Sequence, residues 1–216
     1  MRRLLTLTAS LVTLSLTLGG CGIIGERGSG TMATETRQVS GFQEIDLSGS
    51  GHVLVSVTGT ESLTVEAEDN ILPLLTSEVR NGRLVLGARR SISPTREIVY
   101  TITVVSLEGV SVSGSGIVTA TGIDVSGFDV EISGSGTVVP EGVAERIDLS
   151  ISGSGRFDGD ELVSSSGHVS ISGSGRAVVK VTDDLDVEVS GSGRVEYLGD
   201  PAVTSSISGS GSVSKG

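Results

Sequence analysis

The segment 130–139, VEISGSGTVV, contains the tetrapeptide Ser-Gly-Ser-Gly. The chain has seven copies of this motif, which begin at Ser48, Ser113, Ser133, Ser152, Ser172, Ser190 and Ser208. From Ser113 onward, successive copies start 20, 19, 20, 18 and 18 residues apart. A period near twenty residues is typical of a solenoid, in which each repeat forms one coil and stacks on the next.

Apolar residues recur at fixed distances from each motif. Directly before it stand Val112, Ile132, Ile151, Ile171, Val189 and Ile207, and two positions after it stand Val118, Val138, Phe157, Ala177, Val195 and Val213. Three positions before it the residue is again apolar, except Ser205 in the last copy, and the residue between these two positions is polar. This alternation predicts strands with one buried face. We therefore expect an all-β protein, a parallel β-helix with coils of 18–20 residues and a narrow Val/Ile core.

The motif itself is expected to form a tight corner, because glycine adopts backbone conformations that other residues avoid. Stacked corners also leave little room for side chains. The serines are expected to form a ladder of hydroxyl groups along the corner. The glycines assigned this structural role are Gly114, Gly116, Gly134, Gly136, Gly153, Gly155, Gly173, Gly175, Gly191, Gly193, Gly209 and Gly211.

The predicted β-helix domain spans residues 41–216, and its first part, 41–108, is less regular than the repeats of 109–216. Residues 42–57 carry the repeat signature, and 63–67 and 97–106 are predicted strands. Residues 69–75 are expected to form a helical turn, and 79–86 a hairpin that turns at Asn81-Gly82. This part is expected to cap one end. No capping element follows the last motif, so we expect that edge to pack against a second copy or to be blunted only by Lys215.

Residues 1–20 have the features of a secretory signal peptide: Arg2 and Arg3, then an uncharged apolar stretch from Leu4 to Leu18. The sequence Leu18-Gly19-Gly20-Cys21 resembles the lipobox of bacterial lipoproteins, which implies cleavage before Cys21 and its lipidation, with palmitate among the acyl chains. The alternative is an ordinary signal peptide followed by a free cysteine. Residues 21–40 are then a lipidated cysteine and a flexible tether, and the partner is the membrane. Gly22 after the cysteine fits sorting to the outer membrane.

The charge balance excludes some partners. The formal net charge of −11 becomes −13 after cleavage, because Arg2 and Arg3 are lost and no acidic residue is. A general basic field that would bind nucleic acid or an anionic membrane is therefore absent. Aromatic residues make up only 2% of the chain, which disfavours a sugar-stacking surface.

Catalytic and metal-binding signatures are missing from the sequence, and we expect no cofactor and no enzyme activity. The two histidines, His52 and His168, lie far apart and are expected to be solvated. Acidic residues cluster at Asp158, Asp160 and Glu161 and at Asp183 and Asp184, but neither group matches a calcium-binding repeat. These acids are expected to be solvated turn residues, with a weak calcium contact as the alternative.

One column of charged residues points to a ligand. Arg156, Arg176 and Arg194 each follow a motif directly, on three consecutive repeats. If they stack, they form a cationic ladder suited to the carboxylates or sulfates of a polysaccharide. Alternatively, they pair with the nearby acids Asp148, Asp186 and Glu188, and such exposed pairs stabilise a fold by about 0–1 kcal/mol.

The lipobox, the segment FQEIDLSGSGHVLVSV, the hairpin RNGRLVL and the repeated Gly-Ser-Gly together resemble the putative auto-transporter adhesin head (GIN) domain family, formerly a domain of unknown function. The resemblance implies a right-handed β-helix, a role in adhesion and no catalytic residues. The function we expect is a non-enzymatic, exported envelope lipoprotein that presents a β-helix surface for binding. The alternatives are a self-associating structural protein and, as a minor alternative, a polysaccharide-active enzyme.

Overall fold

The computed structural model describes residues 25–216, so the predicted signal peptide and Cys21 lie outside the described residues. The single helical element in this range is the 3-10 turn η1 (Leu72–Leu74). The strands are β1 (Glu26–Arg27), β2 (Met32–Arg37), β3 (Glu44–Gly49), β4 (His52–Val57), β5 (Ser62–Glu68), β6 (Leu75–Arg80), β7 (Arg83–Ala88), β8 (Ile92–Ser93), β9 (Val99–Val104), β10 (Gly109–Gly114), β11 (Ile117–Gly134), β12 (Thr137–Gly153), β13 (Arg156–Gly173), β14 (Arg176–Gly191), β15 (Arg194–Leu198), β16 (Ala202–Gly209) and β17 (Ser212–Lys215).

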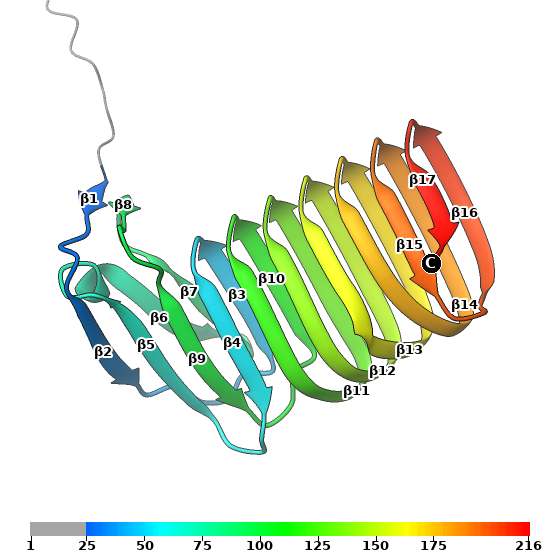
Figure 1. The fold of residues 1–216 in the computed structure, drawn as a ribbon. Coiled ribbons are helices and arrows are strands. Elements are labelled where there is room, and N and C mark those ends of the chain that lie inside the picture. The colour runs from blue at the N-terminus through cyan, green and yellow to red at the C-terminus, as the bar shows by residue number, and fades with distance from the viewer. Residues whose placement is uncertain (1–24) are drawn as a thin grey trace, which may run out of the picture.

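The repeats form stacked parallel coils, as predicted (Figure 1). Each of β11 to β14 is a long strand that bends in its middle, so its two halves lie on opposite faces of a flattened coil. We call the strands that run into the motifs the first face (β3, β10, the second halves of β11–β14, and β16). The strands that leave them form the second face (β4, the first halves of β11–β14, β15 and β17). The fold is thus a β-solenoid whose motifs align along one edge, the motif edge.

The core lies between the two faces and consists of the predicted apolar columns. Ile132, Ile151 and Ile171 on the first face, and Val138 and Phe157 on the second, are at most 1% exposed. Each such side chain stabilises the fold by about 1.5–3 kcal/mol when fully buried. Because successive coils repeat the same small set of side chains, this narrow core continues through the stack.

The corner at each motif is held by main-chain hydrogen bonds between coils. Ser135 N donates to Gly114 O at 2.8 Å, and Thr137 N donates to Gly116 O at 3.0 Å, and the later corners repeat this pattern. Between residues 25 and 216 no hydrogen bond joins the hydroxyl groups of stacked motif serines, so the predicted hydroxyl ladder is wrong. The serine side chains point to solvent, and the backbone supplies the ladder instead.

The first part of the domain contains the predicted local elements. Strands β6 and β7 form an antiparallel hairpin whose turn residues Asn81 and Gly82 have φ of 51° and 78°. These positive values are those of a type I′ turn, for which Asn-Gly is the preferred sequence. Turn η1 lies within the predicted helical segment, and β5 and β9 fall at the predicted strands. With β2, these elements cover the N-terminal end of the solenoid.

The stacking order of this part differs from its order in the chain. Strand β3 lies between β7 and β10, and β4 lies between β9 and β11, with parallel pairing throughout. The coil of residues 44–57 is therefore inserted between the coil of residues 83–104 and the first regular repeat. The loop 89–98 takes the place on the motif edge that an SGSG corner occupies in the other coils.

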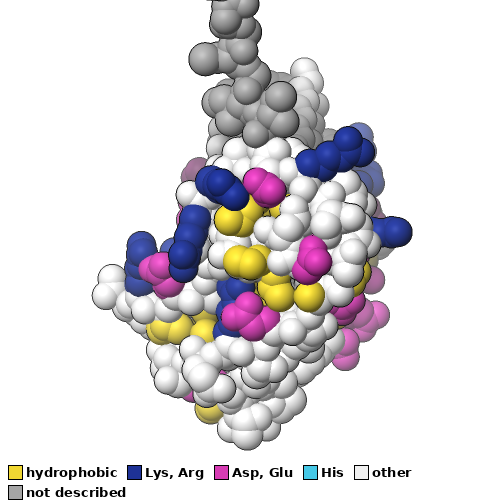
Figure 2. All heavy atoms as spheres, turned by 90° about the vertical axis from the view of Figure 1, so that its left-hand side faces the viewer, with side chains coloured by type: hydrophobic (Ala, Val, Ile, Leu, Met, Phe, Trp, Pro, Cys, Tyr) yellow, Lys and Arg dark blue, Asp and Glu magenta, His cyan; other side chains and the backbone are white. Residues whose placement is uncertain are grey.

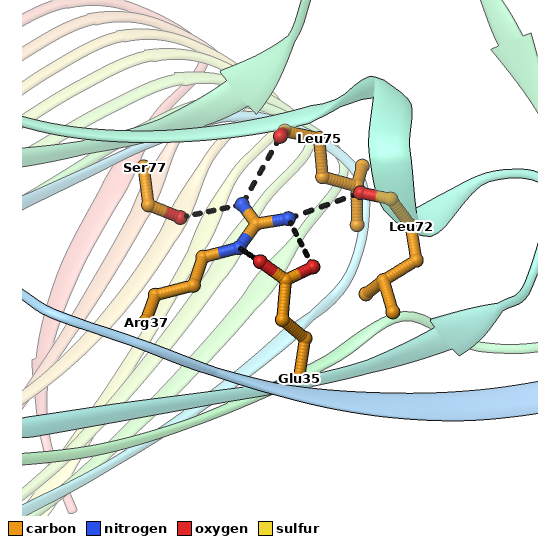
Figure 3. A network of polar contacts seen from close by, with 5 residues as sticks. All are labelled: Glu35, Arg37, Leu72, Leu75 and Ser77. Carbon is orange, nitrogen blue, oxygen red and sulfur yellow. Dashed lines mark hydrogen bonds and ion pairs between the residues drawn. The ribbon is translucent and has the colours of Figure 1, made fainter.

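Residues 26–37 are not a flexible tether, which corrects the predicted boundary. Strand β2 pairs antiparallel with β5, and its Arg37 fastens it to η1 and β6 (Figure 3). The guanidinium donates to Leu72 O, Leu75 O and Ser77 Oγ, each at 3.0 Å, and pairs with Glu35 at 3.3 Å. Composition suggested a tether because the segment is rich in Gly, Ser and Thr. The pairing of β2 with β5 and the hydrogen bonds of Arg37 nevertheless hold this segment against the domain.

Within residues 25–216, β16 and β17 form the outermost coil, and no further strand pairs with them. All of β16 is exposed, including Val203 and Ile207, which continue the apolar columns of Leu185 and Val189 (Figure 1). The column that holds Val187 one coil earlier ends in Ser205. The column of Val179 and Tyr197 ends in Lys215.

Candidate ligand-binding ladder

The three arginines of the predicted ladder lie in register on the second face. Arg156 pairs with Arg176, and Arg176 with Arg194, in adjacent parallel strands. Parallel strands lie about 4.8 Å apart, so the three side chains leave the sheet at that spacing. The same column is occupied by Thr137 in the coil before and by Ser212 in the coil after, so the ladder is three residues long.

The arginines border a shallow groove of about 270 Å³ on the motif edge. Its other lining residues are Ser154, Ser174, Ser192, Gly155 and Gly175. The three serines are exposed, so their hydroxyl groups are free to donate hydrogen bonds toward the groove. Guanidinium groups beside hydroxyl donors suit carboxylate, sulfate or phosphate oxygens.

The acids expected to neutralise the ladder do not pair with it. Asp148 pairs with Arg146 at 3.7 Å, and Asp186 lies 3.3 Å from His168 Nδ1; these acids and Glu188 lie on the first face. Arg156 is 3.8 Å from Asp158, two residues along its own strand. Within residues 25–216, Arg176 and Arg194 form no ion pair within 4.0 Å. Two of the three cations are thus unneutralised, and an anion that bridges them would relieve their mutual repulsion.

The other candidate positions form no common site in the described residues. His52 lies on β4, where its Nε2 is 3.1 Å from Thr119 Oγ1, whereas His168 lies on the first face beside Asp186. Asp160, Glu161, Asp183 and Asp184 are exposed. In the described part of the chain, no group of three or more His, Cys, Asp or Glu residues has an arrangement that could hold a metal ion. Over the same residues, no helix has the length and apolarity needed to cross a membrane.

The motif glycines fall into two structural kinds. The first glycine of each copy has φ between 115° and 128° in Gly114, Gly134, Gly153, Gly173, Gly191 and Gly209. In the six copies from Ser113 onward, the second glycine has an ordinary φ, but an added Cβ would lie 2.2–2.6 Å from an apolar side chain of a neighbouring coil; these residues are Gly116, Gly136, Gly155, Gly175, Gly193 and Gly211. Both kinds keep the corner thin enough for coils to stack.

A two-sheeted β-solenoid with a repeated Gly-Ser-Gly corner defines the class of this protein. The model of one family, described as "Putative auto-transporter adhesin, head GIN domain", matches residues 41–201, and the chain belongs to that family. Among curated proteins, no relative matches the chain.

Solved structures share the fold. The structure of a putative adhesin from Bacteroides fragilis is 24% identical, with a TM-score of 0.70, over 88% of this chain and 100% of that one. A putative lipid binding protein from Parabacteroides distasonis is 22% identical, with a TM-score of 0.60, over 88% and 98% of the two chains. A putative adhesin from Parabacteroides merdae is 18% identical, with a TM-score of 0.57, over 89% and 99%.

Sequence reasoning missed one polar cluster. Glu68, the last residue of β5, and the next two residues, Asp69 and Asn70, bind the segment 27–31 through their side chains. The run Glu-Asp-Asn has the turn-forming residues that bind nearby backbone. The segment that it binds lies some forty residues away, and nothing in the sequence indicates that pairing.

Proposed function

We propose that this protein is a lipid-anchored, non-enzymatic binding protein of the bacterial cell envelope, attached through Cys21 to the outer membrane. Membership of a family described as an adhesin head supports a binding role rather than catalysis. The lipobox-like Leu18-Gly19-Gly20-Cys21 supports the anchor, and Cys21 is the only cysteine in the chain.

The arginine ladder is the contact that we assign to an anionic surface ligand, one that repeats carboxylate, sulfate or phosphate groups. The observation that carries this assignment is the in-register column Arg156–Arg176–Arg194, in which two residues lack an acidic partner within the described residues. Three cations at a spacing of about 4.8 Å favour a ligand that presents several charges over one that presents a single charge.

Binding of soluble polyanions tests the ladder. The full-length protein in detergent is expected to bind dextran sulfate or polygalacturonate, with an affinity that falls as salt is raised, and not to bind neutral dextran. The triple variant Arg156→Gln, Arg176→Gln, Arg194→Gln is expected to lose at least tenfold in affinity. The charge-matched control is Arg80→Gln, Arg146→Gln, Lys180→Gln, which removes three cations elsewhere. Equal losses in the two variants would refute the ladder as the site.

Anchoring and location need a separate measurement. Mass spectrometry of the N-terminal peptide is expected to show acyl chains on Cys21, and Cys21→Ser is expected to release the protein from the membrane fraction. Protease treatment of intact cells is expected to remove the domain. Survival in intact cells, with loss after lysis, would place the domain inside the envelope and contradict surface adhesion.

Self-association is the second candidate function, and the open last coil favours it. Val203 and Ile207 remain exposed there, 37% and 45%, although they continue core columns. A second copy that stacks on this coil would bury them. Ser205 and Lys215 in the same coil oppose such stacking, which is why we place this function second.

A further inference from the structure

The N-terminal segment of the domain is fastened to the body by three consecutive residues, Glu68, Asp69 and Asn70, which we call the clasp. Asp69 N donates to Thr31 O at 2.8 Å. Asn70 Oδ1 accepts from Ser29 N at 2.9 Å, and its Nδ2 donates to Arg27 O at 2.8 Å. These contacts fix residues 27–31 along their whole length.

Glu68 joins this segment to the loop 89–98. Glu68 is 1% exposed, and its carboxylate accepts from Gly30 N at 2.7 Å, Thr95 Oγ1 at 2.6 Å and Thr95 N at 2.8 Å. A buried carboxylate is tolerated only when donors surround it in this way. Beyond the clasp, β1 pairs with β8 inside the loop, and Gly25 lies against the backbone of Ile92.

This arrangement leaves only a short chain segment between Cys21 and the domain, and it places the start of the domain on the motif edge. Three residues separate Cys21 from Gly25, a reach of roughly 14 Å when extended, against roughly 70 Å if the tether ran to residue 41. Loop 89–98 occupies a corner position on the motif edge, so the chain leaves the described domain at that edge. A membrane anchor at Cys21 would therefore hold this edge close to the lipid headgroups.

The two long edges differ in charge balance. The motif edge carries the arginine ladder and, at its N-terminal end, the exposed Arg89, Arg90 and Arg96. Acids lie near this edge in similar number. Glu26 pairs with Arg90, Glu97 follows Arg96, and five more acids lie two residues from a motif or from a ladder arginine: Asp46, Glu131, Asp158, Glu188 and Glu196. Positive and negative charges are therefore nearly balanced on the motif edge. Figure 2 views the N-terminal end, where basic side chains lie among acidic ones.

The bends on the opposite edge are strongly acidic. Between residues 141 and 184 they expose Glu141, Glu145, Asp160, Glu161, Asp183 and Asp184, against the two cations Arg146 and Lys180. The net negative charge of the chain is thus concentrated away from the motif edge. An anionic membrane would repel the bends, and it would attract Arg176 and Arg194, which form no ion pair within the described residues.

We infer that the motif edge lies on the surface of the anchoring membrane, with Arg156, Arg176 and Arg194 in contact with the phosphates of anionic lipids. This inference rests on the lipid anchor and the anion-binding ladder proposed above, and it names the ligand of that ladder. Each basic residue near an anionic bilayer adds only a small attraction. Such a contribution is too small for capture from solution but sufficient to orient an anchored domain.

Fluorescence quenching tests this orientation. The lipidated full-length protein is placed in vesicles of phosphatidylcholine with phosphatidylglycerol, with a quencher attached to lipid headgroups. Acylation blocks Cys21, so an introduced cysteine is the only free thiol. Ser133→Cys places the label on the motif edge, and Glu145→Cys places it at the opposite bend of the same solenoid. Quenching is expected to be at least threefold stronger at residue 133. The difference should shrink with the triple ladder variant and in vesicles of phosphatidylcholine alone.

Each other outcome overturns the inference and separates it from the proposed function. Equal quenching at the two positions in lipidated protein would refute the orientation and leave the anchor intact. Tight binding of dextran sulfate by the vesicle-bound protein, unaffected by phosphatidylglycerol, would show that the ladder is free and serves a soluble polymer. Protein without acyl chains on Cys21 would refute the anchor and, with it, the orientation.

Discussion

Gly173 lies directly over the carbonyl group of Gly153, so that a Cβ on Gly173 would be 2.5 Å from that oxygen. From Gly114 onward, the same relation links the first glycine of each motif to the first glycine of the motif one coil earlier. Since the neighbouring atom is backbone in a packed stack, it has no rotamer with which to move away.

Alanine substitutions should therefore act differently at the two glycines of one motif. Gly173→Ala combines a φ of 121° with the backbone clash, and we expect a loss of about 3 kcal/mol or more in the free energy of unfolding. In Gly175→Ala the obstacle is Ile151 Cγ2, 2.6 Å from the added Cβ. A double-mutant cycle with Ile151→Ala, measured by denaturant unfolding, should show favourable coupling of about 1–2 kcal/mol for Gly175→Ala and none for Gly173→Ala. Equal coupling for both would contradict this assignment.

Arg37 should be the arginine whose loss most weakens the N-terminal end. Its side chain is 13% exposed and donates to two backbone carbonyl groups and one hydroxyl group. We expect Arg37→Ala to lower the free energy of unfolding by about 2–4 kcal/mol, because it leaves these acceptors unpaired. Arg80→Ala is the control, since that side chain is 69% exposed, and it should change stability by less than about 0.5 kcal/mol. Similar effects in denaturant titrations would show that the Arg37 network is dispensable.

The clasp should make stability depend on pH. The hydrogen bond from the Thr95 hydroxyl, with those from three backbone N–H groups, lowers the pKa of Glu68 below its ordinary value of 4.5, against the opposing effect of burial. A lowered pKa in the folded state stabilises above pH 4.5, and this stabilisation is lost as the pH falls through the lowered pKa. The difference in thermal midpoint between the natural protein and Glu68→Gln should therefore be large at pH 7 and shrink below pH 4.5. Glu66→Gln, at an exposed position of the same strand, should show no such trend.

The last coil should self-associate when its two polar residues in core columns, Ser205 and Lys215, are made apolar. Lys215 pairs with Asp200 at 2.8 Å, and this contact raises the pKa of Lys215 and lowers that of Asp200, so both stay charged at neutral pH. A charge at an inward-facing edge position opposes edge-to-edge pairing. Ser205→Val with Lys215→Val should produce dimers or longer assemblies in analytical ultracentrifugation, in a concentration-dependent manner. A natural protein that already dimerises through this coil would contradict the expected role of these two residues.

Much of the fold follows from the sequence because each coil repeats the same short-range pattern. The columns through Ile132 and Val138 were sufficient to predict strands, coil length and core, and the register of Arg156, Arg176 and Arg194 follows from the motif spacing. What the sequence does not indicate depends on long-range pairing. The attachment of β2 to β5, the clasp at residues 68–70 and the position of β3 between β7 and β10 each join segments without a shared local pattern.

The insertion of the coil of residues 44–57 between two later segments limits where the solenoid can gain or lose whole coils. Residues 83–104 must fold back past that coil before the first regular repeat can stack on it, so the N-terminal half is a single cooperative unit that tolerates no loss of a coil. From β11 to β14 each coil contacts only its neighbours, and one more block of 18–20 residues adds one more layer. The number of coils can therefore vary only in the C-terminal half, where duplication or deletion of a repeat preserves the kind of contact that each remaining coil makes with its neighbours.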